Sequence, residues 1–195
     1  MTTGNLEGRA GDGRIGRVVF SEERIRERVA QLGREITEHY GSGGDLVVVG
    51  LLKGSFIFLA DLVRAIERPL QVDFLVAASY GAGTVSSGEV RLLYGPRVEL
   101  RGRRVLVVED ILDSGNTVNR VMPELERHGP RSLDLCALLR KGGGSVRHPP
   151  RWVGFDAPDD FLVGYGLDHA EELRHLPFIA ALQGGGAGFH NLGVD

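Results

Sequence analysis

The stretch VLVVEDILDSGNTV, residues 105–118, joins an apolar run to a series of chemically active side chains. Arg104 to Val108 is short and rich in β-branched residues, which is typical of a strand buried on both faces. The adjacent carboxylates Glu109 and Asp110 follow directly, and a third carboxylate comes at Asp113. We therefore expect the chemistry of this protein to be concentrated at the end of one buried strand.

The residues after this strand fit a site for a sugar phosphate. Gly115 permits a tight turn, so the amides and hydroxyls of residues 113–117 can converge on a phosphate at the amino end of the next helix. Glu109 and Asp110 are costly beside a buried strand unless they have partners, and ribose hydroxyls or a hydrated magnesium ion are suitable ones. The alternative is structural: the carboxylates end a strand, and DSGNT forms a turn with a helix cap.

The segments around this motif alternate between strand-like and helix-like patterns. An amphipathic helix is predicted from Ser21 to Gly41, a buried strand at 46–52 and a helix at 56–66, followed by strands at 72–79 and 89–93. Beyond the motif we expect a helix at 117–128 and strands at 133–139, 152–155, 161–165 and 178–182. This order predicts an α/β fold with a mainly parallel sheet flanked by helices, which binds ligands at the carboxyl ends of its strands.

The length and the glycine distribution define the domain organisation. A chain of 195 residues with 42% hydrophobic content can bury one core, and we expect a single domain over residues 18–182. Many of the 29 glycines lie near the two ends and at 142–144. We therefore expect a flexible N-terminal segment at 1–17, a flexible loop at 142–144 and a flexible glycine-rich tail at 183–195.

Charge and cysteine content narrow the class of protein. A net charge of -3 gives no overall field that attracts nucleic acid or membrane, so neither is an expected partner. The single Cys136 cannot form an intrachain disulfide and lies in an apolar run, which fits a reducing cytoplasm. No apolar stretch approaches the roughly 18 residues of a membrane span. We expect a soluble cytoplasmic protein.

Residues 105–118 resemble the phosphoribosyl pyrophosphate signature of type I phosphoribosyltransferases. Three further segments are similar to the hypoxanthine-guanine branch of that family: LLKGSFIFLADLVRAI at 51–66, VDFLVAASYGAGTVSSGEV at 72–90 and VGFDAPDDFLVGYGLDHAEELRHLPFIAAL at 153–182. The resemblance extends from Phe20 to Leu182 and implies the type I fold, with a mobile lid loop and a small hood from the terminal segments. It also implies a purine-salvage transferase that converts hypoxanthine or guanine to IMP or GMP with release of pyrophosphate, using Mg²⁺ and assembling as a homodimer or tetramer.

The resemblance assigns roles to single residues. Those that contact the ribose and the 5′-phosphate are Glu109 and Asp110 for the ribose, and Asp113, Ser114, Gly115, Asn116 and Thr117 for the phosphate. Asp113 is also the implied proton acceptor for the purine, and Lys141, Phe161 and Leu162 are its implied binding residues. The pyrophosphate would contact Lys53, Gly54 and Arg174, and Mg²⁺ would be held by Asp168, Glu109 and Asp110. Ser79 and Tyr80 would lie at the tip of the lid.

Several of these assignments have a plainer interpretation. Lys53 alone reads as a surface lysine before a helix, Phe161 as a core aromatic, and residues 79–89 as a long hairpin. The glycine-rich segment after Lys141 departs from the family pattern, which leaves the register of Lys141 open, with Arg140 or a residue of the 142–147 loop as the alternative contact to the purine. Asn116 is also a less usual choice within its loop.

Three other functions compete with the implied one. A transferase of the same fold could take another base such as xanthine, and substrate profiling with the four purines separates these. A regulator of this fold could bind RNA, but the charge of -3 counts against it. A structural protein would have no need for Glu109, Asp110 and Asp113 together.

Overall fold

The computed structural model of the protein describes residues 13–80, 89–142 and 145–183. Its helices are α1 (Glu22–Tyr40), α2 (Phe56–Ala65) and α3 (Asn116–Glu126). Its strands are β1 (Ile15–Phe20), β2 (Leu46–Leu52), β3 (Leu70–Tyr80), β4 (Glu89–Tyr94), β5 (Arg104–Leu112), β6 (Ser132–Arg140), β7 (Trp152–Asp156), β8 (Leu162–Val163) and β9 (Ile179–Leu182). None of the helices described is long and apolar enough to cross a membrane.

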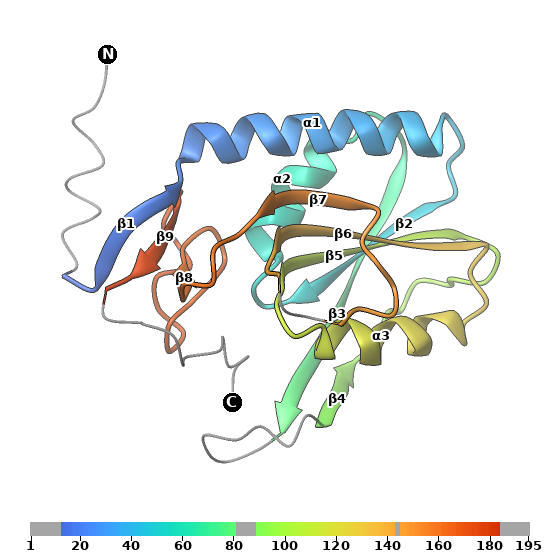
Figure 1. Ribbon diagram of the computed structural model, residues 1–195. Coiled ribbons are helices and arrows are strands. Elements are labelled where there is room, and N and C mark those ends of the chain that lie inside the picture. Colours follow the sequence, from blue (N-terminus) through green and yellow to red (C-terminus); the bar gives the residue numbers. More distant parts are fainter. Residues whose placement is uncertain (1–12, 81–88, 143–144, 184–195) are drawn as a thin grey trace.

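The main sheet has six strands in the order β4-β3-β2-β5-β6-β7 (Figure 1). All neighbouring pairs from β3 to β7 are parallel, and only β4 runs antiparallel to its neighbour β3. Helices α1 and α2 pack on one face of the sheet and α3 on the other, each over its own apolar cluster. The predicted α/β fold with a mainly parallel, helix-flanked sheet is confirmed.

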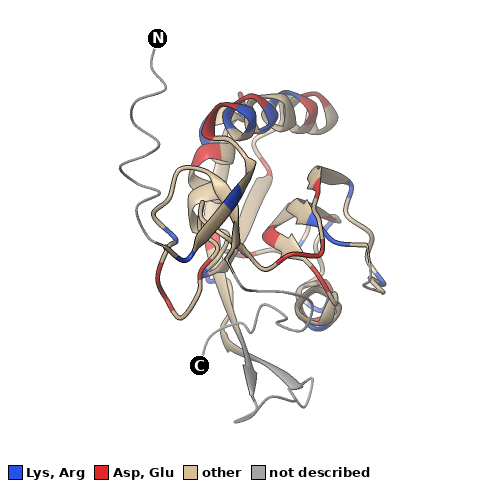
Figure 2. Cartoon of the chain, turned by 60° about the vertical axis from the view of Figure 1, so that its left-hand side comes forward, with Lys and Arg blue, Asp and Glu red and all other residues tan. Residues whose placement is uncertain are grey.

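The two ends and the buried face of helix α1 follow the signals that predicted this helix from the sequence. The Ser21 hydroxyl accepts a hydrogen bond from the Arg24 backbone N–H at 3.3 Å, and the helix ends at Gly41, whose φ is 65°. Between these ends Ile25, Val29 and other apolar residues recur on the buried face. In Figure 2 blue (Lys, Arg) and red (Asp, Glu) stretches alternate along the ribbon of the same helix, as expected for a helix with one face in contact with solvent.

A second sheet joins the two ends of the chain. Strands β1 and β8 both pair antiparallel with β9, in the order β1-β9-β8, and Figure 1 shows this small sheet to one side of the main one. Strand β1 was not predicted, and the expected boundary of a flexible segment at residue 17 falls inside it. Its backbone is ordered by pairing with a segment more than 150 residues later, and the half-exposed Val18 breaks the alternation by which a strand is recognised.

Two strands differ from their predicted lengths in ways that affect the site. Strand β5 continues four residues beyond Val108, because Ile111 and Leu112 still pair with Leu139 and Arg140 of β6. The carboxylates of Glu109 and Asp110 therefore belong to the strand itself rather than to a following loop. Strand β8 covers only two of the five expected residues, because Gly164 and Tyr165 have φ values of 96° and 51°, outside the extended region.

Candidate active site

Three neighbouring strands deliver the predicted site residues to one edge of the main sheet. Lys53 and Gly54 follow β2, Asp113 follows β5 and Lys141 follows β6, and β2, β5 and β6 lie side by side and parallel. Carboxyl ends of parallel strands form the usual binding edge of an open α/β sheet. Residues separated by almost ninety positions in the sequence are thus brought to the same edge.

Gly54 is the point at which three parts of the site meet. A Cβ atom at this position would overlap the carboxylate of Asp110, so only glycine lets the loop after β2 lie against β5. Gly166 approaches from the other side: its φ is 103°, and a Cβ there would overlap the carbonyl oxygen of Gly54. The predicted ribose and pyrophosphate residues are therefore in direct contact, with the 166–174 segment resting on them.

Arg174 is held by a set of contacts within that segment. Its guanidinium donates to the carbonyl oxygen of Gly166 at 2.8 Å and forms ion pairs with Asp168 at 2.8 Å and Glu171 at 3.4 Å. Asp168 also accepts the backbone N–H of Glu171 at 2.8 Å. Glu171 then reaches Lys53, with 3.1 Å between Oε2 and Nζ. The two predicted pyrophosphate cations are thus bridged by a carboxylate that sequence reasoning did not single out.

The adjacent carboxyls of Glu109 and Asp110 have unusual electrostatics. Burial raises the pKa of Glu109 well above its ordinary value, and the neighbouring Asp110 charge raises it further. Burial also raises the pKa of Asp110 to about 6, partly offset by hydrogen bonds from the backbone and by Arg174. The Oε2 atom of Glu109 is buried and has no hydrogen-bond partner within the described structure. Within this pair, Glu109 is therefore the carboxyl that still has room for a hydrogen-bond donor or a cation.

The loop from Asp113 to Asn116 turns the chain from β5 into α3. Gly115 has a φ of 78°, the left-handed conformation that glycine adopts without strain, and it precedes the first residue of the helix. No side chain caps this helix start; the Asn116 N–H only meets the Ser114 hydroxyl at a long 3.4 Å. Free amide groups at a helix amino end favour an anion, as the sequence predicted for Ser114, Gly115, Asn116 and Thr117.

Asn119 on α3 is a positioning residue that sequence reasoning missed. Its side-chain amide donates to the Ser145 carbonyl oxygen at 2.8 Å and accepts from the Arg147 N–H at 2.8 Å. Residues 145–147 are thereby fixed beside Gly115, where a Cβ would come within 3.0 Å of Val146. The local signal was weak, because both partners lie in a glycine-rich stretch with no periodic pattern.

Lys141 lies between this loop and the end of β6. Its backbone N–H donates to the Leu112 carbonyl oxygen at 2.8 Å, and its side chain is almost fully buried. The ammonium lies 3.6 Å from Asp113 Oδ2. Arg140, the alternative purine-binding cation, instead forms a mostly exposed ion pair with Asp156. The structure therefore brings a buried cation, Lys141, to the predicted proton acceptor and directs Arg140 to another partner.

The predicted purine-binding residues Phe161 and Leu162 have different environments. Phe161 is partly buried and meets the His169 ring edge-on at 5.7 Å between centroids. The side chain of Leu162 is fully buried in the main core, while its backbone pairs with Ala181 of β9. Ser79 and Tyr80 end strand β3, and the rest of the predicted lid, residues 81–88, lies outside the described part of the chain.

The three predicted metal ligands do not form one ligand cluster. Among residues 13–80, 89–142 and 145–183, no group of three or more His, Cys, Asp or Glu side chains could hold a metal ion together. Asp168 is instead paired with Arg174, while Glu109 and Asp110 adjoin each other on β5. Mg²⁺ commonly takes one or two carboxylates and completes its shell with substrate oxygens and water. The unpartnered Glu109 oxygen fits such a partial site.

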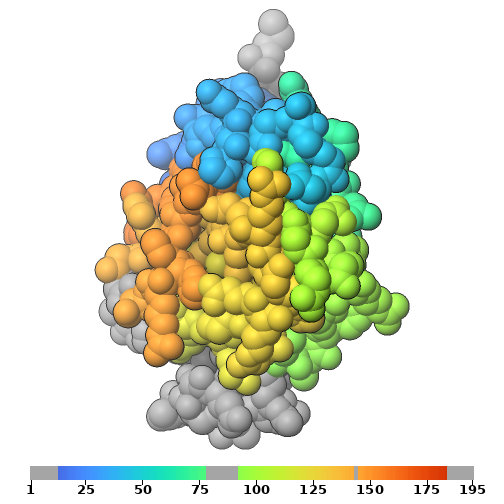
Figure 3. Space-filling model, turned by 90° about the vertical axis from the view of Figure 1, so that its right-hand side faces the viewer, coloured from blue at the N-terminus to red at the C-terminus, as the bar shows by residue number. Residues whose placement is uncertain are grey.

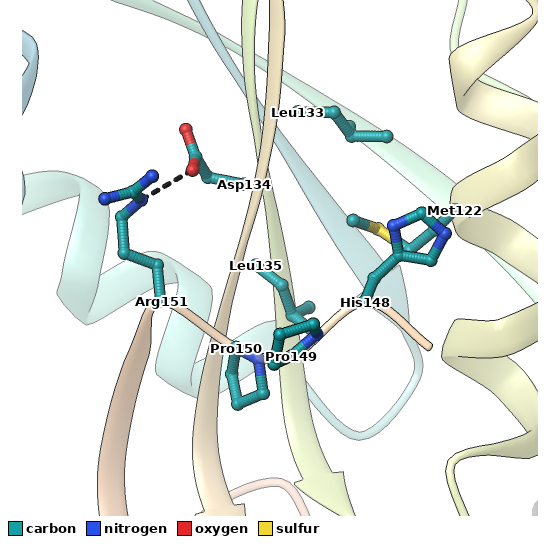
Figure 4. Close-up of a pocket in the computed structure, with 8 residues that line it drawn as sticks. All are labelled: Met122, Leu133, Asp134, Leu135, His148, Pro149, Pro150 and Arg151. Carbon is teal, nitrogen blue, oxygen red and sulfur yellow. Dashed lines mark hydrogen bonds and ion pairs between the residues drawn. The ribbon is translucent and has the colours of Figure 1, made fainter. Parts of the chain in front are cut away.

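A groove lies at the opposite edge of the sheet. It has a volume of about 340 Å³ and is lined by Met122, Leu133, Asp134, Leu135, His148, Pro149, Pro150 and Arg151. It faces the viewer in Figure 3 between the yellow and orange parts of the surface, and Figure 4 shows Arg151 paired with Asp134 beside it. The lining residues of β6 belong to its amino end, so the groove is separate from the site at Lys141.

Comparisons with known proteins agree with this arrangement. The family model for the phosphoribosyl transferase domain matches residues 20–170. Hypoxanthine phosphoribosyltransferase of Escherichia coli is 48% identical over 164 residues, which cover 83% of this chain and 92% of the relative. Hypoxanthine-guanine phosphoribosyltransferase of Dictyostelium discoideum is 46% identical over 170 residues, covering 85% and 94%. The solved structure of the Trypanosoma cruzi hypoxanthine enzyme with its product IMP superposes with a TM-score of 0.81 at 35% identity, covering 88% of this chain and 96% of that one.

Proposed function

This chain belongs to the phosphoribosyl transferase domain family, and from that premise we infer that it transfers the phosphoribosyl group of phosphoribosyl pyrophosphate to hypoxanthine or guanine. The products are IMP or GMP and pyrophosphate, so the protein is a purine-salvage enzyme. The observation that carries the inference is the meeting of a helix start without a side-chain cap, the adjacent Glu109 and Asp110 carboxylates and the Lys141–Asp113 pair at one edge of the sheet.

The phosphoribosyl donor, phosphoribosyl pyrophosphate, is anchored at both of its ends in this proposal. The 5′-phosphate accepts hydrogen bonds from the loop of residues 114–117, where the helix start supplies free amide groups. The ribose hydroxyls donate to Glu109 and Asp110; the buried Oε2 atom of Glu109 has no hydrogen-bond donor in the described structure. Lys53, the Gly54 backbone and Arg174 hold the pyrophosphate. Fixing both ends presents C1 of the ribose to the base, and this positioning supplies much of the rate enhancement.

The base is held by contacts to its edge and its face. The Lys141 ammonium donates to the 6-oxo group, Phe161 stacks on the ring, and the Leu162 backbone contacts the ring edge. A bond forms between a purine nitrogen and C1 of the ribose, while the bond from C1 to the pyrophosphate oxygen breaks. The proton displaced from the purine ring passes to the Asp113 carboxylate, which lies 3.6 Å from the Lys141 ammonium.

Mg²⁺ is part of the proposal, with Glu109, Asp110 and Asp168 as the residues that would hold it. The fit rests on the buried, unpartnered oxygen of Glu109 and the raised pKa of Asp110, about 6, both of which a cation would relieve. When bound, the ion would neutralise charge on the departing pyrophosphate. Asp168 must then exchange part of its ion pair with Arg174 for the new contact.

We also propose that the enzyme acts in the cytoplasm and as a homo-oligomer, a dimer or a tetramer. A cytoplasmic location fits the buried thiol of Cys136, and none of the helices in the described residues could cross a membrane. The homo-oligomer fits the exposed apolar side chains on β3 and β4, which include Val72, Phe74, Leu93 and Tyr94. A sedimentation measurement separates the monomer, dimer and tetramer.

Choice of the base provides a test of the Lys141 assignment. With adenine bound, the Lys141 ammonium would face the 6-amino group, and both groups are hydrogen-bond donors. This mismatch costs roughly 1 to 3 kcal/mol, which lowers kcat/KM for adenine by about ten- to a hundredfold. Lys141→Ala should weaken hypoxanthine and guanine together and narrow their advantage over adenine. The measurement is kcat/KM for hypoxanthine, guanine, xanthine and adenine with both proteins; xanthine is included because it is the rival substrate.

The matched control is Arg140→Ala, since Arg140 pairs with Asp156 at the surface. This variant should keep the wild-type order of bases. Should Lys141→Ala retain its full preference for hypoxanthine over adenine while Arg140→Ala loses it, the purine-binding cation is Arg140 and our assignment is wrong.

A further inference from the structure

The turn between His169 and Glu172 has an unusual backbone for its sequence. His169 and Glu172 exchange both backbone hydrogen bonds, each at 3.1 Å, which leaves Ala170 and Glu171 as the two residues at the tip. Both have positive φ, 52° and 67°. Two-residue turns of this kind strongly favour Asn, Asp or Gly, because a Cβ destabilises the left-handed conformation. Glu171 therefore occupies a position that turn chemistry alone would not assign to it.

The strained position directs the Glu171 carboxylate between two cations. Its Oε2 lies 3.1 Å from Lys53 Nζ, and its Oε1 lies 3.4 Å from Arg174 Nη2. Its backbone N–H is fixed by Asp168 at 2.8 Å, so the turn cannot rotate freely away from these partners. Lys53 and Arg174 come from segments about 120 residues apart, and the carboxylate is the group that bridges them. Backbone strain retained at such a place points to function.

We propose that Glu171 competes with pyrophosphate for Lys53 and Arg174, its carboxylate occupying the pyrophosphate position in the substrate-free protein. The inference rests on the proposed function, in which Lys53 and Arg174 bind the pyrophosphate. An incoming pyrophosphate must displace the carboxylate from both cations and then lies beside its negative charge. Binding is therefore weaker than the two cations alone would give, and the carboxylate returns to them as pyrophosphate leaves.

The neighbouring Glu172 provides a control with the same charge and nearly the same place in the sequence. Its carboxylate pairs with Arg14 at 2.7 Å, and the side chain is mostly exposed. Neither Lys53 nor Arg174 is among its ion-pair partners in the described structure. Replacing Glu172 changes the net charge by the same amount as replacing Glu171, but it leaves the bridge between the two cations in place.

The test is the affinity of the full chain for pyrophosphate with Mg²⁺, measured by titration calorimetry for wild type, Glu171→Gln, Glu171→Asn and Glu172→Gln. In both Glu171 variants, Lys53 and Arg174 lose their ion pairs with residue 171, and pyrophosphate no longer lies beside a negative charge. Both variants should therefore bind pyrophosphate roughly three- to tenfold more tightly than wild type. Glu172→Gln should stay within about twofold of wild type, as expected for a screened surface charge. The KM for phosphoribosyl pyrophosphate should fall in parallel with the dissociation constant.

Thermal unfolding separates this role from a structural one. Asn tolerates the left-handed conformation better than Glu, so Glu171→Asn should unfold no lower than wild type while binding more tightly. If Glu171 only stabilised the loop, both variants would unfold earlier and bind more weakly, and that result would overturn the inference. Unchanged affinity in both variants would overturn it as well. No binding of pyrophosphate by the wild type would instead refute the assignment of Lys53 and Arg174, on which the inference rests.

Discussion

Replacing Asp113 by asparagine is expected to lower turnover by about 10²- to 10⁴-fold, the usual contribution of a general base. The change keeps the shape of the side chain but removes the atom that accepts the purine proton. It also leaves the nearly buried Lys141 ammonium without its carboxylate partner at 3.6 Å. The binding of phosphoribosyl pyrophosphate should change much less, because the donor is held by the neighbouring loop and by β5. The measurement is kcat for hypoxanthine together with the dissociation constant of the donor.

Asp156→Asn serves as the matched control for this change. Asp156 is an exposed aspartate at the end of β7 that pairs with Arg140, so its replacement should leave turnover within about twofold of wild type, as is usual for surface substitutions. If turnover of Asp113→Asn is unchanged while donor binding collapses, Asp113 is a ligand of the ribose or phosphate and not the proton acceptor.

Removal of divalent metal is expected to abolish the reaction, and addition of Mg²⁺ should restore it. Pyrophosphate carries more negative charge than Lys53 and Arg174 can neutralise, and both cations already contact Glu171. Glu109 and Asp110 would add to the repulsion whenever they are ionised. The measurement is the initial rate with an excess of chelator, followed by titration with Mg²⁺; calcium is the control for a cation of equal charge but different geometry. Full activity in excess chelator would refute the metal requirement.

The local part of the site was predictable from sequence because its chemistry is contiguous. Residues 105–118 hold a buried strand, two adjacent carboxylates, Asp113 and a glycine with positive φ within a single stretch. The exact end of β5 was not predictable, since Ile111 and Leu112 remain in the strand through pairing with β6. A strand boundary set by its neighbour leaves no signal in its own residues.

The parts that sequence reasoning missed depend on contacts between distant segments. Strand β1 forms because β9 lies beside it, and the pairing joins the two ends of the domain. Glu171 becomes notable only when Lys53, 118 positions earlier, is placed against it. The close approach of Gly54, Asp110 and Gly166 is likewise a joint property of two loops and strand β5. Residue type alone cannot identify such contacts, because each residue also has an ordinary surface or loop role.

The direct test of phosphoribosyl transfer is one assay of the purified protein with phosphoribosyl pyrophosphate, Mg²⁺ and labelled hypoxanthine. The expected result is labelled IMP and pyrophosphate in equal amounts, with guanine giving GMP in the same way and adenine giving little nucleotide. Failure to form nucleotide from either 6-oxopurine, under conditions in which the protein is folded and binds the donor, would contradict the proposed function.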